Sequence, residues 1–159
     1  MSEITVRRAE EKDIPRMLDL LVQVCMVHHN GRPDLFKGPA TKYSEEELKA
    51  ILQDPERPIF AAADAADTMQ GYAFCIHEQI KGDSVRTDIR TLYIDDICVE
   101  ETARGQHIGR KLYDHVLEYA RQNGFYNVTL NVWACNENAM KFYESCGLRP
   151  QKTGMEAIL

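Results

Sequence analysis

The sequence predicts an α/β fold: a mixed, mostly antiparallel sheet with flanking helices and a splayed parallel strand pair at its centre. Short apolar segments of the strand type lie between segments whose apolar residues recur at steps of three and four, as on one face of a helix. Their order is β-α-α-β-β-β-α-β-α-β. Only the two strands on either side of the third helix must be parallel, because a right-handed crossover joins them.

Each expected element has a local signal. Apolar runs bounded by turn residues predict strands at residues 4–8, 59–65, 71–80, 92–99, 127–132 and 148–159. Apolar stripes with capping residues predict helices at residues 14–27, 45–53, 108–123 and 137–146. Asp13 and Asn136 are the expected N-caps of the first and last helices, and Ser44 opens the second with a capping box. The polar run at residues 28–33 is expected to end the first helix.

The strand at residues 92–99 changes its apolar face in the middle. Its apolar positions are first even-numbered and then odd-numbered: Leu92, Ile94, Ile97 and Val99. Because side chains alternate with a period of two, one extra residue at Asp95-Asp96, a β-bulge, would restore a common apolar face. A strand that is apolar on both faces would give the same pattern. The adjacent carboxylates argue against that reading, since buried unpaired acids are costly, and predict a wet cleft.

A loop with two glycines joins this strand to the third helix. It reads Arg104-Gly105-Gln106-His107-Ile108-Gly109-Arg110. The first N–H groups of a helix lack intrahelical partners and carry the positive end of the macrodipole. A strand-loop-helix junction with two flanking arginines therefore predicts a phosphate site.

Composition limits the classes of function. The length of 159 residues fits one domain, residues 1–159, and the content of 44% hydrophobic and 28% charged residues is ordinary for a soluble protein. A net charge of −6 argues against nonspecific nucleic-acid binding and favours a cationic partner. Five cysteines, an odd number, indicate free thiols in a reducing compartment. No signal peptide opens the chain and no apolar run approaches the roughly 18 residues of a membrane helix, so no membrane association and a cytoplasmic location are expected.

Two motifs resemble signatures of the GNAT superfamily of acyl-CoA-dependent N-acetyltransferases. The glycine loop is similar to the family's acetyl-CoA loop, Q/R-x-x-G-x-G/A, with His107 where the family usually has Gly. The second signature, Asn-x-x-Ala-x-x-Phe-Tyr-x-x-x-Gly-aromatic/Leu, matches Asn136, Ala139, Phe142, Tyr143, Gly147 and Leu148. One loop motif would be weak evidence, but both motifs follow the expected strands. The resemblance implies a GNAT fold and acetyl transfer from acetyl-CoA to a primary amine.

The resemblance also implies where acetyl-CoA binds. Its pantetheine arm would pair with backbone groups of Ile97 and Val99 at the edge that the bulge exposes. The side chain of Asn136 would hold the same arm, although a plain N-cap role is equally compatible. The pyrophosphate would lie on the loop and first helical turn, formed by Arg104, Gly105, Gln106, His107, Ile108, Gly109 and Arg110.

Three residues are expected to carry the chemistry. The acceptor must be a neutral amine, and a free alkylamine has a pKa near ~10, so a base or a desolvating site must remove its proton. Asp95 and Asp96 resemble the acidic pair of the family's polyamine acetyltransferases. Asp95 is favoured as the base and Asp96 as an orienting or substrate-binding group, unless one of them only caps the bulge. Tyr143 matches the family's general acid for the leaving thiolate, and its spacing also fits a packed aromatic face.

The acceptor and the assembly stay open at this point. A small amine, such as a polyamine or an aminoglycoside-like molecule, is favoured over a protein N-terminus or lysine. A protein that binds acyl-CoA as a sensor, without catalysis, is the alternative to an enzyme. His28 and His29 are expected to line the acceptor side and not to bind a metal, because no second ligand pair stands at zinc spacing. The last strand, with its apolar end, predicts a homodimer that covers an open sheet edge.

Overall fold

The sheet is mixed, as predicted, and the computed structural model describes it within residues 3–159. Its five strands lie in the order β1-β2-β3-β4-β5, and all neighbours are antiparallel except β4 and β5, which are parallel. The parallel pair therefore lies at one edge of the sheet and not at its centre as predicted, because residues 148–159 add no strand beyond β5. The strands are β1 (Thr5–Arg8), β2 (Ile59–Ala63), β3 (Met69–Gln79), β4 (Arg90–Val99) and β5 (Asn127–Leu130). Every predicted strand up to residue 132 is therefore present.

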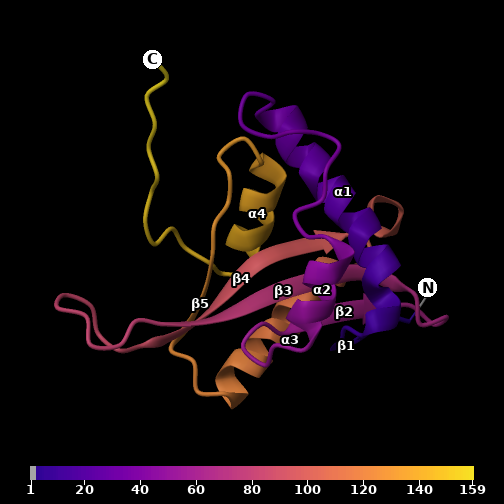
Figure 1. Ribbon diagram of the computed structural model, residues 1–159, viewed down its shortest axis with the longest axis horizontal. Coiled ribbons are helices and arrows are strands. Elements are labelled where there is room, and N and C mark those ends of the chain that lie inside the picture. Colours follow the sequence, from indigo (N-terminus) through magenta and orange to yellow (C-terminus); the bar gives the residue numbers. More distant parts are fainter. Residues whose placement is uncertain (1–2) are drawn as a thin grey trace.

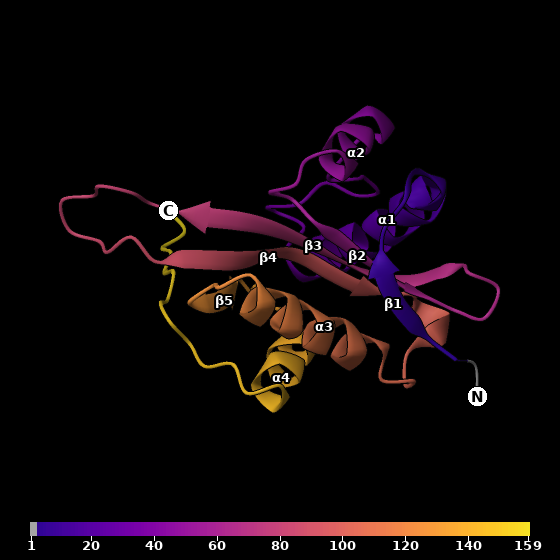
Figure 2. The same ribbon diagram turned by 90° about the horizontal axis from the view of Figure 1, so that it is seen from below.

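The helices cover both faces of the sheet. They are α1 (Ile14–Gly31), α2 (Glu45–Leu52), α3 (Ile108–Gln122) and α4 (Glu137–Ser145), with 3-10 turns at Glu11–Asp13 and Glu101–Ala103. Helices α1 and α2 lie on one side of the sheet, and α3 and α4 lie on the other (Figures 1 and 2). This arrangement gives three layers and the flanking helices that the sequence predicts.

Each face of the sheet has its own apolar cluster. On the α1 side, Met17 and Leu21 pack with Tyr72 and Phe74, all of them buried. The cluster on the α3 side joins Leu112 and Val116 to Phe60, Ala73 and Ile94. Fully burying one such large side chain contributes about 1.5–3 kcal/mol. The two clusters together hold the sheet between its helices and fix which face each strand residue occupies.

Helix α1 continues through Gly31, so the prediction that the polar run ends it near residue 27 is wrong. Polar side chains prevent burial but not helix formation, and the N–H group of Arg32 donates to the carbonyl of His28 (2.8 Å), closing the last turn. Pro33 then ends the helix, because it lacks an N–H group and disfavours helical geometry at the residue before it.

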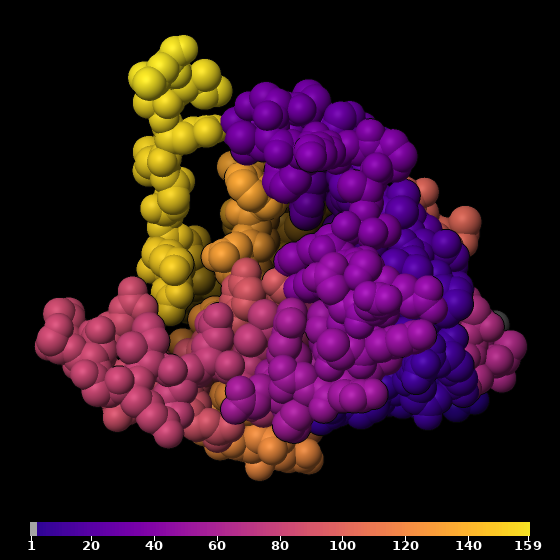
Figure 3. Space-filling view, in the orientation of Figure 1, coloured from indigo at the N-terminus to yellow at the C-terminus, as the bar shows by residue number. Residues whose placement is uncertain are grey.

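The chain beyond α4 does not join the sheet. Residues 148–159 are extended but form no strand or helix within the single chain. The predicted last strand is therefore wrong. Leu148 packs against the cluster on the α3 side, and Glu156 forms an ion pair with Arg32 just after α1. Between these contacts the segment has open space beside it in the space-filling view (Figure 3). Met155 is 89% exposed and Ile158 80% exposed. We call residues 148–159 the C-terminal tail.

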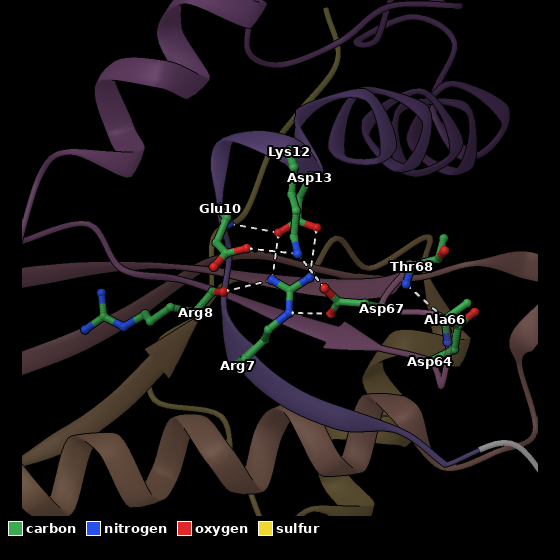
Figure 4. A network of polar contacts seen from close by, with 9 residues as sticks. All are labelled: Arg7, Arg8, Glu10, Lys12, Asp13, Asp64, Ala66, Asp67 and Thr68. Carbon is green, nitrogen blue, oxygen red and sulfur yellow. Dashed lines mark hydrogen bonds and ion pairs between the residues drawn. The ribbon is translucent and has the colours of Figure 1, made fainter.

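Asp13 is buried, 3% exposed, but its side chain does not cap α1 as predicted. It accepts hydrogen bonds from the Arg7 guanidinium (2.8 and 3.1 Å) and from the backbone N–H group of Glu10 (2.8 Å). Arg7 also donates to Asp67 (2.9 Å) in the turn between β2 and β3 (Figure 4). These bonds tie β1, the start of α1 and that turn together.

Membrane-spanning helices are not found in residues 3–159, where no helix is both long and apolar enough to cross a bilayer.

Replacing Asp13 should destabilise the protein markedly. The change Asp13→Ala removes two of the hydrogen bonds of Arg7, whose side chain is 22% exposed and which keeps Asp67, and it removes the side-chain acceptor of the Glu10 N–H group. We expect the free energy of unfolding, measured by urea denaturation, to fall by roughly 2–4 kcal/mol. The control is Asp67→Asn at the half-exposed end of the same cluster, where a loss of no more than about 1 kcal/mol is expected. Equal losses in the two variants would contradict this account.

Candidate active site

The predicted bulge is present in β4, at Asp95. In the pairing of β3 with β4, Cys75 faces Ile94 and Phe74 faces Asp96, so Asp95 has no partner across the ladder. The apolar residues on both sides of the bulge then reach the same cluster on the α3 side: Leu92, Ile94, Ile97 and Val99. The change of parity in the sequence is therefore the mark of one inserted residue.

The bulge also directs two neighbouring carboxylates to one face of the sheet. In a regular strand, adjacent side chains point to opposite faces. Here Asp95 contacts Lys42 and Tyr43 from the loop before α2, and Asp96 contacts Tyr72, which belongs to the cluster on the α1 side. Both acids thus lie on the α1 and α2 side.

Strands β4 and β5 part at the same place. Their pairing runs from Thr91 opposite Asn127 to Ile94 opposite Leu130 and stops there. On its other edge β4 stays paired with β3 as far as Val99, and the N–H group of Glu100 donates to Gln70 (2.8 Å). Because backbone groups alternate between the two edges, those of Ile97 and Val99 face the open edge. An extended ligand can pair with that edge as an added strand.

The loop after β4 leads to the N-terminus of α3 at Ile108. Gly105 has φ +90°, and His107 has φ +60° in the left-handed region. A histidine tolerates this conformation better than most residues, at a cost of about 1 kcal/mol. Gly109 allows close packing, since a Cβ atom there would lie 3.2 Å from the Phe142 ring. Arg104 is exposed at this loop, while Arg110 donates to Asp114 (3.0 Å).

Asp95 is held by a cation and a hydroxyl group. The Lys42 ammonium lies 2.7 Å from one carboxylate oxygen, and the Tyr43 hydroxyl donates to the other (2.6 Å). Arg57 in turn donates to the Tyr43 hydroxyl (3.0 Å). Burial, followed by the hydrogen bond to Asp95, raises the pKa of Tyr43, so this hydroxyl stays protonated and keeps donating.

Asp96 has a different environment. It accepts a hydrogen bond from the hydroxyl of Tyr72 (2.7 Å), a fully buried residue of β3, and another from the backbone N–H group of Ile97. Burial raises the pKa of Asp96 to about 6, and this effect exceeds the opposing effects of the Tyr72 hydrogen bond and the charge of Lys42. The carboxylate therefore gains and loses its proton close to neutral pH, as a general base requires.

Tyr143 approaches this region from α4, on the opposite side of the parted strands. Burial, followed by the negative charge of Asp96, raises the pKa of Tyr143 above its ordinary value. Its ring packs against Phe142, with centroids 5.2 Å apart. Asn136 caps α4 as predicted, since its side-chain oxygen accepts from the Ala139 N–H group (3.2 Å). A tyrosine hydroxyl that stays neutral at physiological pH is a suitable proton donor.

The end of α1, the loop that follows it and the segment after β5 contact one another. The ring of His28 lies 5.0 Å from that of Phe36, which meets Trp133 edge to face at 5.0 Å. Gly31 fits closely against Cys135, because a Cβ atom at position 31 would lie 2.7 Å from its sulfur. That His28 lines the acceptor side stays a prediction. Within residues 3–159, no group of His, Cys, Asp or Glu is arranged to hold a metal ion.

Sequence reasoning missed four residues of the site: Lys42, Tyr43, Arg57 and Tyr72. The alternation of β3 places Tyr72 and Phe74 on one face, which was visible in the sequence. The contact of Tyr72 with Asp96 beside the bulge was not visible in the sequence, because it depends on the register between β3 and β4. Lys42 and Tyr43 come from an irregular loop, whose path no local pattern predicts.

Comparison with known proteins identifies the family. The family model described as the acetyltransferase (GNAT) family matches residues 26–148. The chain belongs to this family. Its enzymes use acetyl-CoA as co-substrate, and the helix N-terminus, the open strand edge and the exposed arginine described above fit the phosphates and the extended arm of such a ligand.

Named relatives act on several different amines. Glucosamine 6-phosphate N-acetyltransferase 1 of Oryza sativa subsp. japonica is 30% identical over 115 residues, which cover 69% of this chain and 67% of that protein. Thialysine N-epsilon-acetyltransferase of Sus scrofa is 26% identical over 166 aligned positions, covering 94% of this chain and 86% of that protein.

Solved structures share the whole fold. A point mutant of the BH1408 protein from Bacillus halodurans superposes with a TM-score of 0.93 at 28% identity, over 98% of this chain and 99% of that chain. The aminoglycoside acetyltransferase meta-AAC0020 from an uncultured soil sample shares the fold, with a TM-score of 0.68 at 19% identity over 98% of this chain and 96% of that chain.

Replacing Asp96 should stabilise the protein at neutral pH. Its pKa is about 6 in the folded chain and near ~4 in the unfolded chain, so stability falls as the pH rises between these values. The change Asp96→Asn removes this effect. We expect urea unfolding at pH 7.5 to give a gain of roughly 1–2 kcal/mol, with little difference at pH 4. Asp114→Asn, at an exposed ion pair, is the control. A loss of stability that is the same at both pH values would contradict the raised pKa.

Proposed function

We propose that this chain transfers the acetyl group of acetyl-CoA to the primary amine of a small acceptor, with polyamines and aminoglycoside-like molecules as the favoured class. One observation carries the proposal: the open edge of β4 begins at two carboxylates, and the charge of one of them, Asp96, acts on Tyr143 of α4. Binding of acetyl-CoA alone needs neither the acids nor the tyrosine. The relatives named for glucosamine 6-phosphate and thialysine support a small amine as the acceptor.

The cofactor would lie along the open edge of β4 and the start of α3. We expect the N–H groups of residues 106–110 and the side chain of Arg104 to hold the pyrophosphate. Arg110 would join them by exchanging its ion pair with Asp114. The backbone groups of Ile97 and Val99 would pair with the pantetheine arm. The amide nitrogen of Asn136 can donate to the same arm, while its oxygen caps α4.

We assign the two acids different roles. Asp95 already neutralises a cation and accepts from a hydroxyl group, so it is suited to bind and orient an ammonium group. Asp96, with no cation in direct contact among the described residues and a pKa of about 6, is better suited than Asp95 to take the proton of the amine. This reverses the preference drawn from the sequence. Since the base must be ionised, the rate should decline as the pH falls below about 6.

Tyr143 would return a proton to the departing thiolate. A thiol has a pKa near ~8.5, and the raised pKa of Tyr143 keeps its hydroxyl protonated and able to donate at neutral pH. Burial raises the pKa values of Cys75 and Cys98 to about 12, so these two thiols are poor nucleophiles at neutral pH. Direct attack by the acceptor amine, without an acyl-enzyme, fits these properties.

Removing the Tyr143 hydroxyl should slow turnover and leave binding intact. Thiol release from acetyl-CoA is followed with polyamines, aminoglycosides, amino acids and short peptides as acceptors. With the best acceptor, Tyr143→Phe should lower kcat by roughly 10²-fold, while calorimetric affinity for acetyl-CoA stays within about twofold. Tyr113→Phe, at a buried tyrosine of α3, is the matched control. Arg104→Glu should instead weaken acetyl-CoA binding.

Two results would contradict the proposed chemistry. If the wild-type chain binds acetyl-CoA but transfers nothing to the whole panel, the chain is a non-catalytic acyl-CoA-binding module. If short peptides are acetylated and small amines are not, the acceptor is a protein terminus or lysine. Full kcat in Tyr143→Phe, with chemistry rate-limiting, would remove Tyr143 from the reaction.

We also propose that two copies assemble through the C-terminal tail. The tail is extended and exposed, and it leaves its backbone groups and the apolar side chains of Met155 and Ile158 in water. Strand β5 is the last strand of the sheet, so its outer edge is available for pairing. If the tail of one copy paired with the β5 edge of a second copy, the backbone groups of the tail and of that edge would gain hydrogen-bond partners. A close match over 98% of this chain to a crystallised relative supports the path of the tail.

Light scattering tests this assembly. The full chain at micromolar concentration should have the mass of a dimer, and a chain ending at residue 149 should have the mass of a monomer because the pairing segment is missing. A monomeric full chain would exclude the homodimer. A truncated chain that stays dimeric would place the interface elsewhere.

A cytoplasmic location is the accompanying proposal. All five cysteines lie within residues 3–159 and are free thiols: two are buried, two are half-buried and one is exposed. Free thiols are typical of a reducing compartment.

A further inference from the structure

One primary amine of the chain itself already lies at the candidate catalytic acids. Lys42 comes from the loop between α1 and α2, and its ammonium group is 2.7 Å from Asp95. The Lys42 side chain is 50% exposed, whereas that of Asp95 is 10% exposed. The lysine can therefore move, while the carboxylate that holds it is fixed in the site.

The Lys42 ammonium group is surrounded by the residues that we assign to the proposed reaction. It lies above the ring of Tyr43, 5.6 Å from its centroid. Its positive charge lowers the pKa of Asp96 and, after the larger effect of burial, that of His28. The charged and titratable groups around it come from β4, the loop, the segment before β2 and α1: Asp95, Asp96, Tyr43, Arg57 and His28. Tyr143 interacts with Asp96 from the far side.

Two other lysines form ion pairs away from this site. Lys12 pairs with Glu10 and Asp67 beside β1, and Lys49 pairs with Glu11 and Glu45 on α2. These carboxylates have no tyrosine or second acid of the site beside them. Lys12, whose side chain is 56% exposed, is therefore a natural internal comparison for Lys42.

We propose, on the basis of the transferase function proposed above, that Lys42 is acetylated by the chain's own site when no free acceptor is bound. Its ammonium group occupies the position on Asp95 that an acceptor ammonium would take. The proposal makes Lys42 both a modification site and a stand-in for the acceptor.

The step is balanced with an acyl-CoA thioester as the acyl donor. The Lys42 ammonium first gives one proton to a carboxylate of the site. The neutral nitrogen attacks the thioester carbonyl carbon, so an N–C bond forms and the C–S bond breaks. The sulfur leaves as a thiolate and takes a proton from Tyr143, which is replaced by the second proton of the nitrogen. The net change converts an ammonium group and a thioester to an amide, a thiol and one proton.

Acetylation would change the site that performs it. An acetylated Lys42 has no charge, so Asp95 loses its ion pair. The pKa of Asp96 would rise further, because the positive charge that lowers it is gone. The modified chain should therefore need a higher pH for the same rate.

The test follows acetylation of individual lysines in the full chain. The protein is incubated with acetyl-CoA and no acceptor, and peptide masses are measured over time for Lys42 and Lys12. We expect Lys42 to be modified at least about tenfold faster than Lys12, because it is held beside the reacting groups. Its rate constant should not depend on protein concentration, as expected for reaction within one chain. Tyr143→Phe should slow modification of Lys42 and leave Lys12 at its chemical background.

Equal rates at Lys42 and Lys12, or a Lys42 rate that Tyr143→Phe does not change, would overturn the inference. Circular dichroism verifies that this variant is folded, and Asp96→Asn provides a second variant with the same expectation. An amine panel in the same preparation separates the two proposals. If a free amine is acetylated and Lys42 is not, self-acetylation is wrong and the transferase function stands. If neither is acetylated, both are wrong.

Discussion

The inserted residue at Asp95 is the constraint on which the rest of the site depends. It lets one strand keep its apolar side chains against α3 on both sides of the bulge, while two neighbouring carboxylates point toward α1 and α2. A regular strand would bury one acid among the apolar side chains on the α3 side or turn the later apolar residues away from it, and either arrangement costs several kcal/mol. The parting of β4 from β5 begins at the same residue. The open edge of β4 and the common orientation of Asp95 and Asp96 thus both follow from one inserted residue.

Adjacent, chemically identical acids differ here through their partners. Asp95 contacts an ammonium group and a hydroxyl group that a guanidinium supports, whereas Asp96 has one buried hydroxyl. The difference in proton affinity therefore comes from the loop before α2 and from β3, and not from the acids themselves. A change in that loop could alter the balance between the acids without any change in β4.

Local patterns in the sequence predict much of this structure, and the failures have a common cause. The capping box at Ser44, the parallel pair and the bulge each depend on residues close together in the chain, and all three are confirmed. The extension of α1 to Gly31 and the unpaired tail were missed, because each depends on what lies beside the segment in space. The same holds for Tyr72 and Lys42, whose roles arise from strand register and loop path.

The close contact between Gly31 and Cys135 sets the distance between two segments of the chain. It joins the end of α1 to the segment after β5, two parts of the chain that no strand pairing connects across the parted strands. A larger residue at position 31 would act as a wedge between these two segments and push them apart, with Asp95 and Asp96 left in place. The distance between these two segments can therefore change through the size of one residue at position 31, independently of the two acids of β4.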